Sequence, residues 1–244
     1  MKFNEFKIRK NSNSLIIGGA TIIGLFLLGF LLKSGIENFK AAERVVSVKG
    51  LAEKEYPANR VIWPIMFKEA GNNLPELYSV VEKKNQEIMS FLKNHGISDA
   101  EMTLNTPEVV DMEADRYASQ TNRIFRYSVT SVLTVYSEKV NDVRKIMSQQ
   151  SELIKKGVPI SGGDYRYNVQ FMFTKLNNIK PAMIEEATKN ARSSADKFAR
   201  DSESTLGKIK SASQGQFTIT DRDANTPHIK TVRVVTTLEY YLKD

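Results

Sequence analysis

Few residues in this chain have the type and spacing that chemistry requires. The 244 residues include no cysteine and two histidines, His95 and His228. Without cysteine there is no thiol nucleophile, no thiolate metal site and no disulfide. His95 falls where a predicted helix ends and His228 falls in a polar loop, and the sequence places no metal-ligand or triad partner beside either. We therefore interpret both histidines as structural residues.

One acidic segment imitates a calcium-binding loop. Asp221, Asp223 and Asn225 follow the D-x-D-x-N spacing with which such loops open. The imitation then fails, because Thr226 stands where the turn glycine belongs and Val232 replaces the bidentate glutamate. The segment is predicted to be a polar loop and not a metal site.

Two further groups have simpler interpretations than catalysis. Ser161-Gly162-Gly163 lacks the spacing of a phosphate-binding loop and the Lys-Ser/Thr that would follow, so it predicts a turn. Glu185 and Glu186 are neighbours on a predicted helix and therefore point about 100° apart, a poor geometry for paired acid and base work. We predict no catalytic residue, no cofactor site and no metal site, and expect a protein that is not an enzyme.

The N-terminal segment is more informative. Residues 15–32 contain only Leu, Ile, Phe, Gly, Ala and Thr. A helix of this length rises about 27 Å, close to the thickness of the hydrocarbon layer of a bilayer. A soluble core helix would show a polar face, and this segment has none. We predict a transmembrane helix at 15–32, in contact with the lipid bilayer.

A cleaved export signal also begins with a basic leader and an apolar run. Here the run is longer than in most cleaved signals, and KSGIENFKAAERVV, which follows it, offers no small-x-small cleavage site. We favour an uncleaved signal anchor, with a soluble periplasmic product after cleavage as the alternative. One small-xxx-small pair, Ala20 and Gly24, lies within the span; such a pair permits helix association but is common in such segments.

The orientation of the span follows from flanking charge. Basic residues before the span outnumber those after it, namely Lys2, Lys7, Arg9 and Lys10 against Lys33, Lys40 and Arg44. Residues 1–14 are therefore predicted to be a basic cytoplasmic stub and 33–44 a connector. We expect residues 45–244 to form a domain on the periplasmic or extracellular side of the cell (inner) membrane.

Charge and composition limit the partners of that domain. The net charge is +7, but four basic residues and one acidic residue lie in the first ten positions. The rest of the excess is dispersed, with no Lys/Arg block longer than two residues and no aromatic RNA-binding motif, so no nucleic-acid partner is expected. A hydrophobic content of 41% predicts a folded core, large enough for one sizeable domain or two small ones.

Periodicity and turn residues predict the elements of this domain. Strands are expected at 45–56, 61–69, 108–115, 125–136, 165–173, 209–220 and 231–242, and helices at 73–95, 140–156 and 181–206. Pro64 lacks an N–H, so its strand should be at a sheet edge or bulged there. Alanines every four residues from Ala187 to Ala199 should let the last helix pack closely. The pattern predicts an α+β fold with a largely antiparallel sheet and helices packed on it.

Several short motifs occur in an order that resembles the SIMPL-domain (DUF541) family over residues 45–244. They are VSVKG at 46–50, the PAN turn at 57–59, LKNHGI at 92–97, Tyr127, ATKNARSSADKFA at 187–199 and LGKI at 206–209. The resemblance implies a SIMPL-like fold and an envelope location, with assemblies that are ring-like in some members and a link to stress tolerance. The family has no catalytic motif. It usually has an acidic residue in the PAN position, where this chain has Asn59, a glycine-richer first strand and often a cleaved signal.

The leading functional hypothesis is a non-enzymatic, membrane-anchored envelope protein whose exported domain forms a homo-oligomer or binds another envelope protein. The strand around Pro64 and the C-terminal strands are the expected contact surfaces. The alternative is a small-ligand binder or an enzyme with an unrecognised site.

Overall fold

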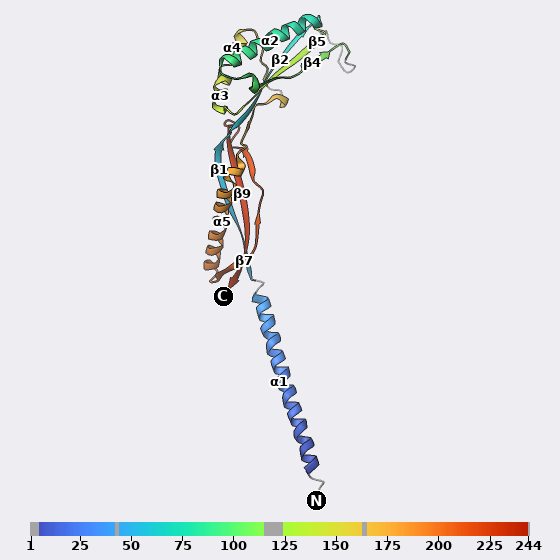
Figure 1. Ribbon diagram of the computed structural model, residues 1–244, viewed down its shortest axis with the longest axis vertical. Helices are drawn as coiled ribbons and strands as arrows, with labels where there is room; N and C mark the ends of the chain where they lie inside the picture. Colours follow the sequence, from blue (N-terminus) through green and yellow to red (C-terminus); the bar gives the residue numbers. More distant parts are fainter. Residues whose placement is uncertain (1–4, 42–43, 115–123, 163–164, 244) are drawn as a thin grey trace. The chain divides into compact units, whose positions relative to one another are not determined.

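The computed structural model describes residues 5–41, 44–114, 124–162 and 165–243 (Figure 1). In chain order the elements are α1 (Glu5–Ala41), β1 (Val45–Pro57), β2 (Arg60–Gly71), α2 (Leu74–Asn94), η1 (Asp99–Glu101), β3 (Met102–Leu104), β4 (Glu108–Asp111), β5 (Tyr127–Ser137), α3 (Val140–Ser148), α4 (Ser151–Lys155), η2 (Tyr165–Tyr167), β6 (Gln170–Met172), α5 (Leu176–Asp201), β7 (Thr205–Gln214), β8 (Thr218–Asp221) and β9 (Ile229–Lys243). The result is a mixed α+β fold with antiparallel sheets.

The chain divides into two compact units. Unit 1 comprises Met1–Ala52, Ala182–Gln216 and Val234–Asp244, and unit 2 comprises Glu53–Pro181 and Phe217–Arg233. The predicted domain at 45–244 therefore contains segments of both units.

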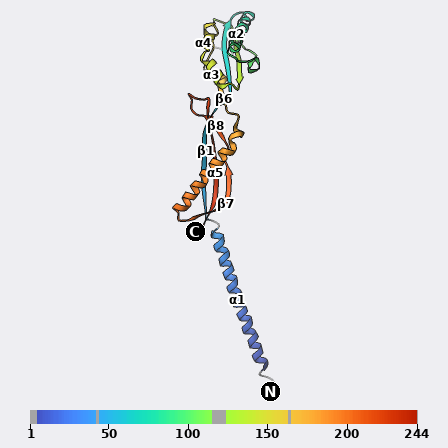
Figure 2. The ribbon, with the colours of Figure 1, turned by 60° about the vertical axis from the view of Figure 1, so that its left-hand side comes forward.

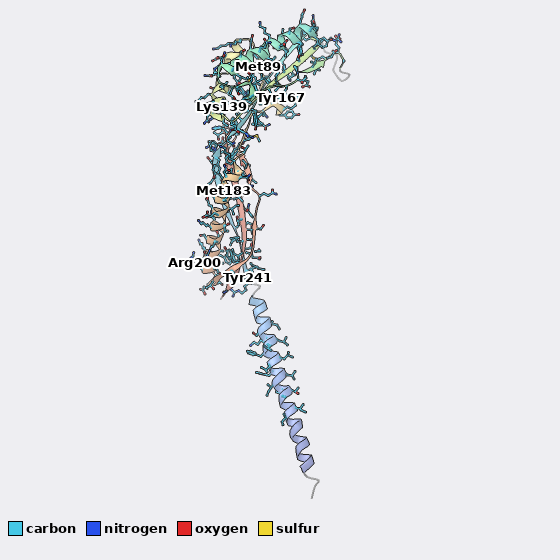
Figure 3. All side chains as sticks on the ribbon, viewed as in Figure 1. Met89, Lys139, Tyr167, Met183, Arg200 and Tyr241 are labelled. Carbon is cyan, nitrogen blue, oxygen red and sulfur yellow. The ribbon has the colours of Figure 1, made fainter. Side chains whose placement is uncertain are left out.

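Helix α1 holds the predicted membrane span. Among the described residues, Ile16–Ile36 is the helical stretch that is long and apolar enough to cross a membrane, with a mean hydropathy of 2.1 and no part of it buried. Its side chains project on several sides of the helix, as Figure 3 shows, and Phe26 is 77% exposed. The helix continues through most of the predicted connector as far as Ala41, since no proline interrupts it.

In unit 1, α5 lies along one face of a sheet with the strand order β1-β9-β7 (Figures 1 and 2). The predicted alanine stripe makes this close packing possible: Ala187, Ala191 and Ala195 are fully buried, and Ala191 and Ala195 form one cluster with Leu238 and Tyr240. Small side chains on the helix let its backbone approach the strands.

In unit 2, β2 and β5 form an uninterrupted antiparallel ladder from Val61↔Ser137 to Gly71↔Tyr127. Helix α2 covers one face of this sheet (Figure 1). The core beneath it joins the inward residues of both strands to the apolar side of α2 and to α3 and α4, and includes Val61, Trp63, Ile65, Phe67, Leu77, Val81, Ile88, Phe91, Leu92, Leu133, Val143 and Leu153.

The predicted signals at the ends of α2 are confirmed. The side chain of Asn73 accepts a bond from the Glu76 N–H at the N-terminus, and Pro75 lies in the first turn. Gly96 follows the helix with φ +90°, a conformation that glycine adopts without a steric cost.

The strand predicted at 165–173 is wrong. Residues 165–167 form the 3₁₀ helix η2, with Tyr165 84% exposed, and only Gln170–Met172 form a strand, β6. An alternating segment forms a strand only where a neighbouring strand has a free edge to pair with. On β2 that edge is short, because β6 pairs with Arg60–Ile62 and the segment at Ile160 already bonds β2 near Phe67.

Two predicted helices have different bounds. The helix predicted at 140–156 is divided at Gln149 and Gln150 into α3 and α4. The helix predicted at 181–206 begins earlier, so that Pro181 lies within it. It also ends at Asp201, where the left-handed φ of +54° at Glu203 and a bond from Ser204 N–H to Ala199 O terminate it.

Two strand predictions also differ in detail, and one short strand was not predicted. Strand β4 ends at Asp111, and residue 115, the end of the predicted strand, lies outside the described residues. The strand predicted at 209–220 is two strands, β7 and β8, which pair with β9 one after the other. Strand β3 was not predicted, because three residues carry too little periodicity.

Candidate interaction surfaces

The structure places both histidines in structural positions. His95 is the C-cap of α2, with its Nδ1 2.8 Å from the carbonyl oxygen of Phe91 and its ring 4.4 Å from the Phe91 ring. His228 is half-buried in the loop before β9, with its ring edge-on to Phe171 at 6.0 Å. Burial, together with the positive charges of Arg144 and Arg222, lowers the pKa of His228.

The carboxylates of the calcium-like loop bond to the loop itself. Asp223 Oδ1 accepts the N–H groups of Asn225 and Thr226, both at 2.8 Å, and its other oxygen bonds the Thr226 hydroxyl and Arg222. These bonds, that of the Thr226 hydroxyl first, lower the pKa of Asp223 to about 2. Asp221 pairs with the buried Lys230. Within the described ranges, no group of three or more acidic or histidine side chains could hold a metal ion.

The remaining sequence candidates also have local roles. Glu185 pairs with Lys189 one turn along α5, and Glu186 is half-buried on the same helix. Ser161 N–H bonds the carbonyl oxygen of Met66, while Gly163 lies outside the described residues. None of these arrangements places an acid beside a base in a cleft.

Sequence reasoning missed the carboxylate of Glu101. It accepts bonds from the Ser137 hydroxyl at 2.6 Å, the Ser98 N–H at 3.0 Å and the Ser98 hydroxyl at 2.8 Å, and it pairs with Lys139. The Ser137 bond is the largest cause that lowers the pKa of Glu101 to about 2. The S-x-x-E spacing from Ser98 is the signal for this capping box, which fixes the start of η1 to the end of β5.

The PAN turn joins three distant segments within unit 2. Asn59 Nδ2 donates to the Thr174 hydroxyl at 2.8 Å, and Thr174 N–H donates to Asn59 Oδ1 at 2.7 Å. Ala58 N–H donates to the carbonyl oxygen of His228, and Asn59 N–H to that of Met172. The turn therefore has a structural role, because every one of these bonds is internal.

The expectation of an edge strand at Pro64 needs correction. Strand β2 lies between β5 and β6, and its ladder with β5 has no bulge at Pro64↔Thr134. Pro64 is tolerated because the β6 ladder ends at Ile62, so no second partner requires its missing N–H.

The face of the unit 2 sheet that carries Pro64 is nevertheless partly exposed. We call it the Pro64 face and define it by Arg60, Ile62, Pro64, Tyr136 and Met172. These residues share a side because Ile62 pairs with Tyr136 and Arg60 with Met172 across antiparallel ladders, and side chains directly opposite share a face. Tyr136 is 45% and Met172 41% exposed.

Charge accompanies the apolar side chains of the Pro64 face. The Arg60 guanidinium lies 5.4 Å from the centre of the Tyr136 ring and bonds Glu138 Oε1 at 2.9 Å. Tyr, Met and Arg are side-chain types that are enriched in protein–protein interfaces.

The C-terminal strands offer less free backbone edge for a partner strand than we expected from the sequence. Strand β9 is central in its sheet, between β1 and β7, so its backbone is not free for a partner strand. Strand β7 is an edge, but two register shifts interrupt it and Lys208 and Lys210 are exposed on it. Irregularity and lysines are the features by which natural edges avoid pairing.

The fold and its surfaces define an α+β protein with antiparallel sheets, preceded by a candidate membrane-spanning helix, whose conspicuous acidic and histidine side chains bond internally. The chain belongs to the SIMPL family, a family of proteins of unknown function (DUF541), whose model matches residues 46–239. The family resemblance of the motifs is thereby confirmed. None of the curated proteins matches the chain.

Proposed function

We propose that this chain is a membrane-anchored, non-enzymatic envelope protein whose exported part acts by binding, first to a second copy of itself through the Pro64 face. The observation that carries the proposal is the group of exposed Tyr136 and Met172 with half-buried Arg60 on an antiparallel sheet. A role in stress tolerance has the support of the family resemblance alone.

The anchor is supported by Ile16–Ile36, whose apolar side chains have no protein layer against them. An apolar helix of this length is costly in water and stable in a bilayer. The charge distribution around it supports a cytoplasmic N-terminus and an exported domain. The intact mass of the mature protein separates an anchor from a cleaved signal, since cleavage would remove the first segment.

A binding role is supported by the hydrogen bonds and pKa values of the ionisable groups. The carboxylates of Asp223 and Glu101 are held ionised by internal donors, which suits structural bonds better than proton transfer at neutral pH. His95 caps a helix.

Self-association is supported by the composition of the Pro64 face. Arg60 on this face pairs with Glu138 just after β5, so a two-fold contact can exchange partners between two copies without an unpaired charge. The apolar side chains of Ile62, Tyr136 and Met172 supply area that a second copy would remove from water.

The test compares the full-length protein in detergent with two variants by light scattering coupled to size-exclusion chromatography. Tyr136→Glu places a charge in the proposed contact. Tyr78→Glu, on the outer side of α2, changes a tyrosine of similar exposure, 51% against 45%, and is the matched control. We expect wild type and Tyr78→Glu to exceed a monomer and Tyr136→Glu to be monomeric. A monomeric wild type, or equal masses for both variants, would overturn self-association through this face.

A further inference from the structure

The nine-residue helix α3 has two contrasting faces. Val140, Val143 and Ile146 are buried in the core of unit 2. The opposite face presents Asn141, Arg144, Lys145 and Ser148, which follow the i, i+3, i+4, i+7 spacing of one side of a helix. These four side chains line a surface hollow of about 420 Å³. We call it the α3 hollow.

Every residue that lines the α3 hollow carries hydrogen-bond donors. Arg144 presents a guanidinium, Lys145 an ammonium and Asn141 an amide, while the Ser148 hydroxyl donates to the carbonyl oxygen of Lys145 at 2.6 Å. Of the two cations, Lys145 has a carboxylate nearby, with its Nζ 3.9 Å from Asp142 Oδ1. That separation is too long for a hydrogen bond, so the donors of Lys145 are still available.

Arg144 is the cation that lacks a counter-charge. Among the described residues it has no ion pair and no hydrogen bond, in contrast to Arg222, which bonds Glu55 and Asp223. The charge of Arg144 still reaches beyond α3, because together with burial it disfavours the protonated form of His228 and lowers its pKa. Arg144 therefore brings to the α3 hollow a positive charge that no carboxylate among the described residues pairs with.

We propose that the α3 hollow binds an oxyanion of the phosphate class. The planar guanidinium of Arg144 can donate two parallel hydrogen bonds to two oxygens of a phosphate group, and Lys145 adds a point charge. Asn141, about one turn before them on the helix, supplies a neutral amide donor for a remaining oxygen. The ligand is either free phosphate or the phosphate of a lipid headgroup, which share this chemistry.

The test is isothermal titration calorimetry on the full-length protein in detergent at constant ionic strength, with chloride as the competing anion. Inorganic phosphate and glycerol 3-phosphate are the two probes, and the second represents a lipid headgroup. We expect saturable binding by wild type and at least tenfold weaker binding by Arg144→Ala. Arg144→Lys keeps the positive charge but loses the two parallel N–H donors of the guanidinium, so its affinity should lie between those of wild type and Arg144→Ala.

Lys155→Ala is the matched control, because Lys155 is an exposed cation on the neighbouring α4 and does not line the hollow. It should bind as wild type does. Tighter binding of glycerol 3-phosphate identifies a headgroup as the ligand, and tighter binding of phosphate identifies the free ion. No saturable heat with either probe, or wild-type affinity in Arg144→Ala, would overturn the proposal. The readout is independent of the oligomeric state that tests the Pro64 face.

Discussion

Asn59 and Thr174, which lie 115 residues apart in the chain, bond each other twice, each acting once as donor and once as acceptor. The PAN turn thus links the start of β2 to the segment after β6 by hydrogen bonds. In this chain the PAN turn therefore closes unit 2 through side-chain and backbone hydrogen bonds.

Loss of the Asn59 side chain should destabilise the fold. Asn59→Ala removes both side-chain bonds and should lower the free energy of unfolding by about 1–3 kcal/mol. Asn59→Asp retains the acceptor for Thr174 N–H, and the Thr174 hydroxyl can turn to donate, so it should cost less. Urea denaturation of the full-length protein measures both. Equal stability of Asn59→Ala and wild type would show that the turn is held by its backbone bonds alone.

Gly50 should tolerate no side chain. A Cβ there would lie 1.9 Å from the carbonyl oxygen of Ala187 and 2.3 Å from the N of Ala191, both backbone atoms of α5. Gly50→Ala must therefore push α5 away from β1, at a cost of at least about 1–3 kcal/mol. Gly162→Ala, where a Cβ would meet no atom within 4 Å, is the control. Thermal unfolding should distinguish them, and identical midpoints would refute this packing of α5 on β1.

Acid should destabilise the protein in a defined range. Glu101 and Asp223 have pKa values lowered to about 2, below the ordinary 4.5 and 3.8. The unfolded chain therefore binds more protons than the folded one between these limits, so their contribution is complete above about pH 4.5 and is lost as the pH falls towards 2. Urea midpoints measured from pH 6 to pH 2.5 should fall in wild type and fall less in Glu101→Gln. Parallel curves would contradict the assigned pKa of Glu101.

Local signals in the sequence were sufficient for part of the fold. The cap at Asn73, the stop at Gly96 and the alanine spacing from Ala187 to Ala199 each act within a few turns of one helix. The apolar span is equally local. These features need no knowledge of distant partners, so periodicity and capping predicted them.

Features that depend on partners far away in the chain were predicted poorly. The aromatic alternation from Tyr165 to Phe173 is typical of a strand, but the β2 edge has room for three residues of β6. The Pro64 face depends on the registers of β2 with β5 and β6. The hydrogen bonds of Asn59 depend on Thr174, which is distant in the sequence. No local pattern encodes such pairings. The spacing of the α3 hollow residues can be read from the sequence. That Arg144 has no ion-pair partner among the described residues and lies near the loop of His228 can be seen only in the structure.

Because the chain has no cysteine, introduced single cysteines give the most direct test of an exported protein that self-associates through the Pro64 face. Tyr136→Cys and the control Tyr78→Cys are expressed at native level, and intact cells with a permeabilised outer layer are treated with a mild oxidant. Our account predicts a disulfide-linked dimer for Tyr136→Cys and none for Tyr78→Cys, with both cysteines open to a membrane-impermeant maleimide before oxidation. Cysteines that the maleimide reaches only after lysis, or equal crosslinking at both positions, would contradict it.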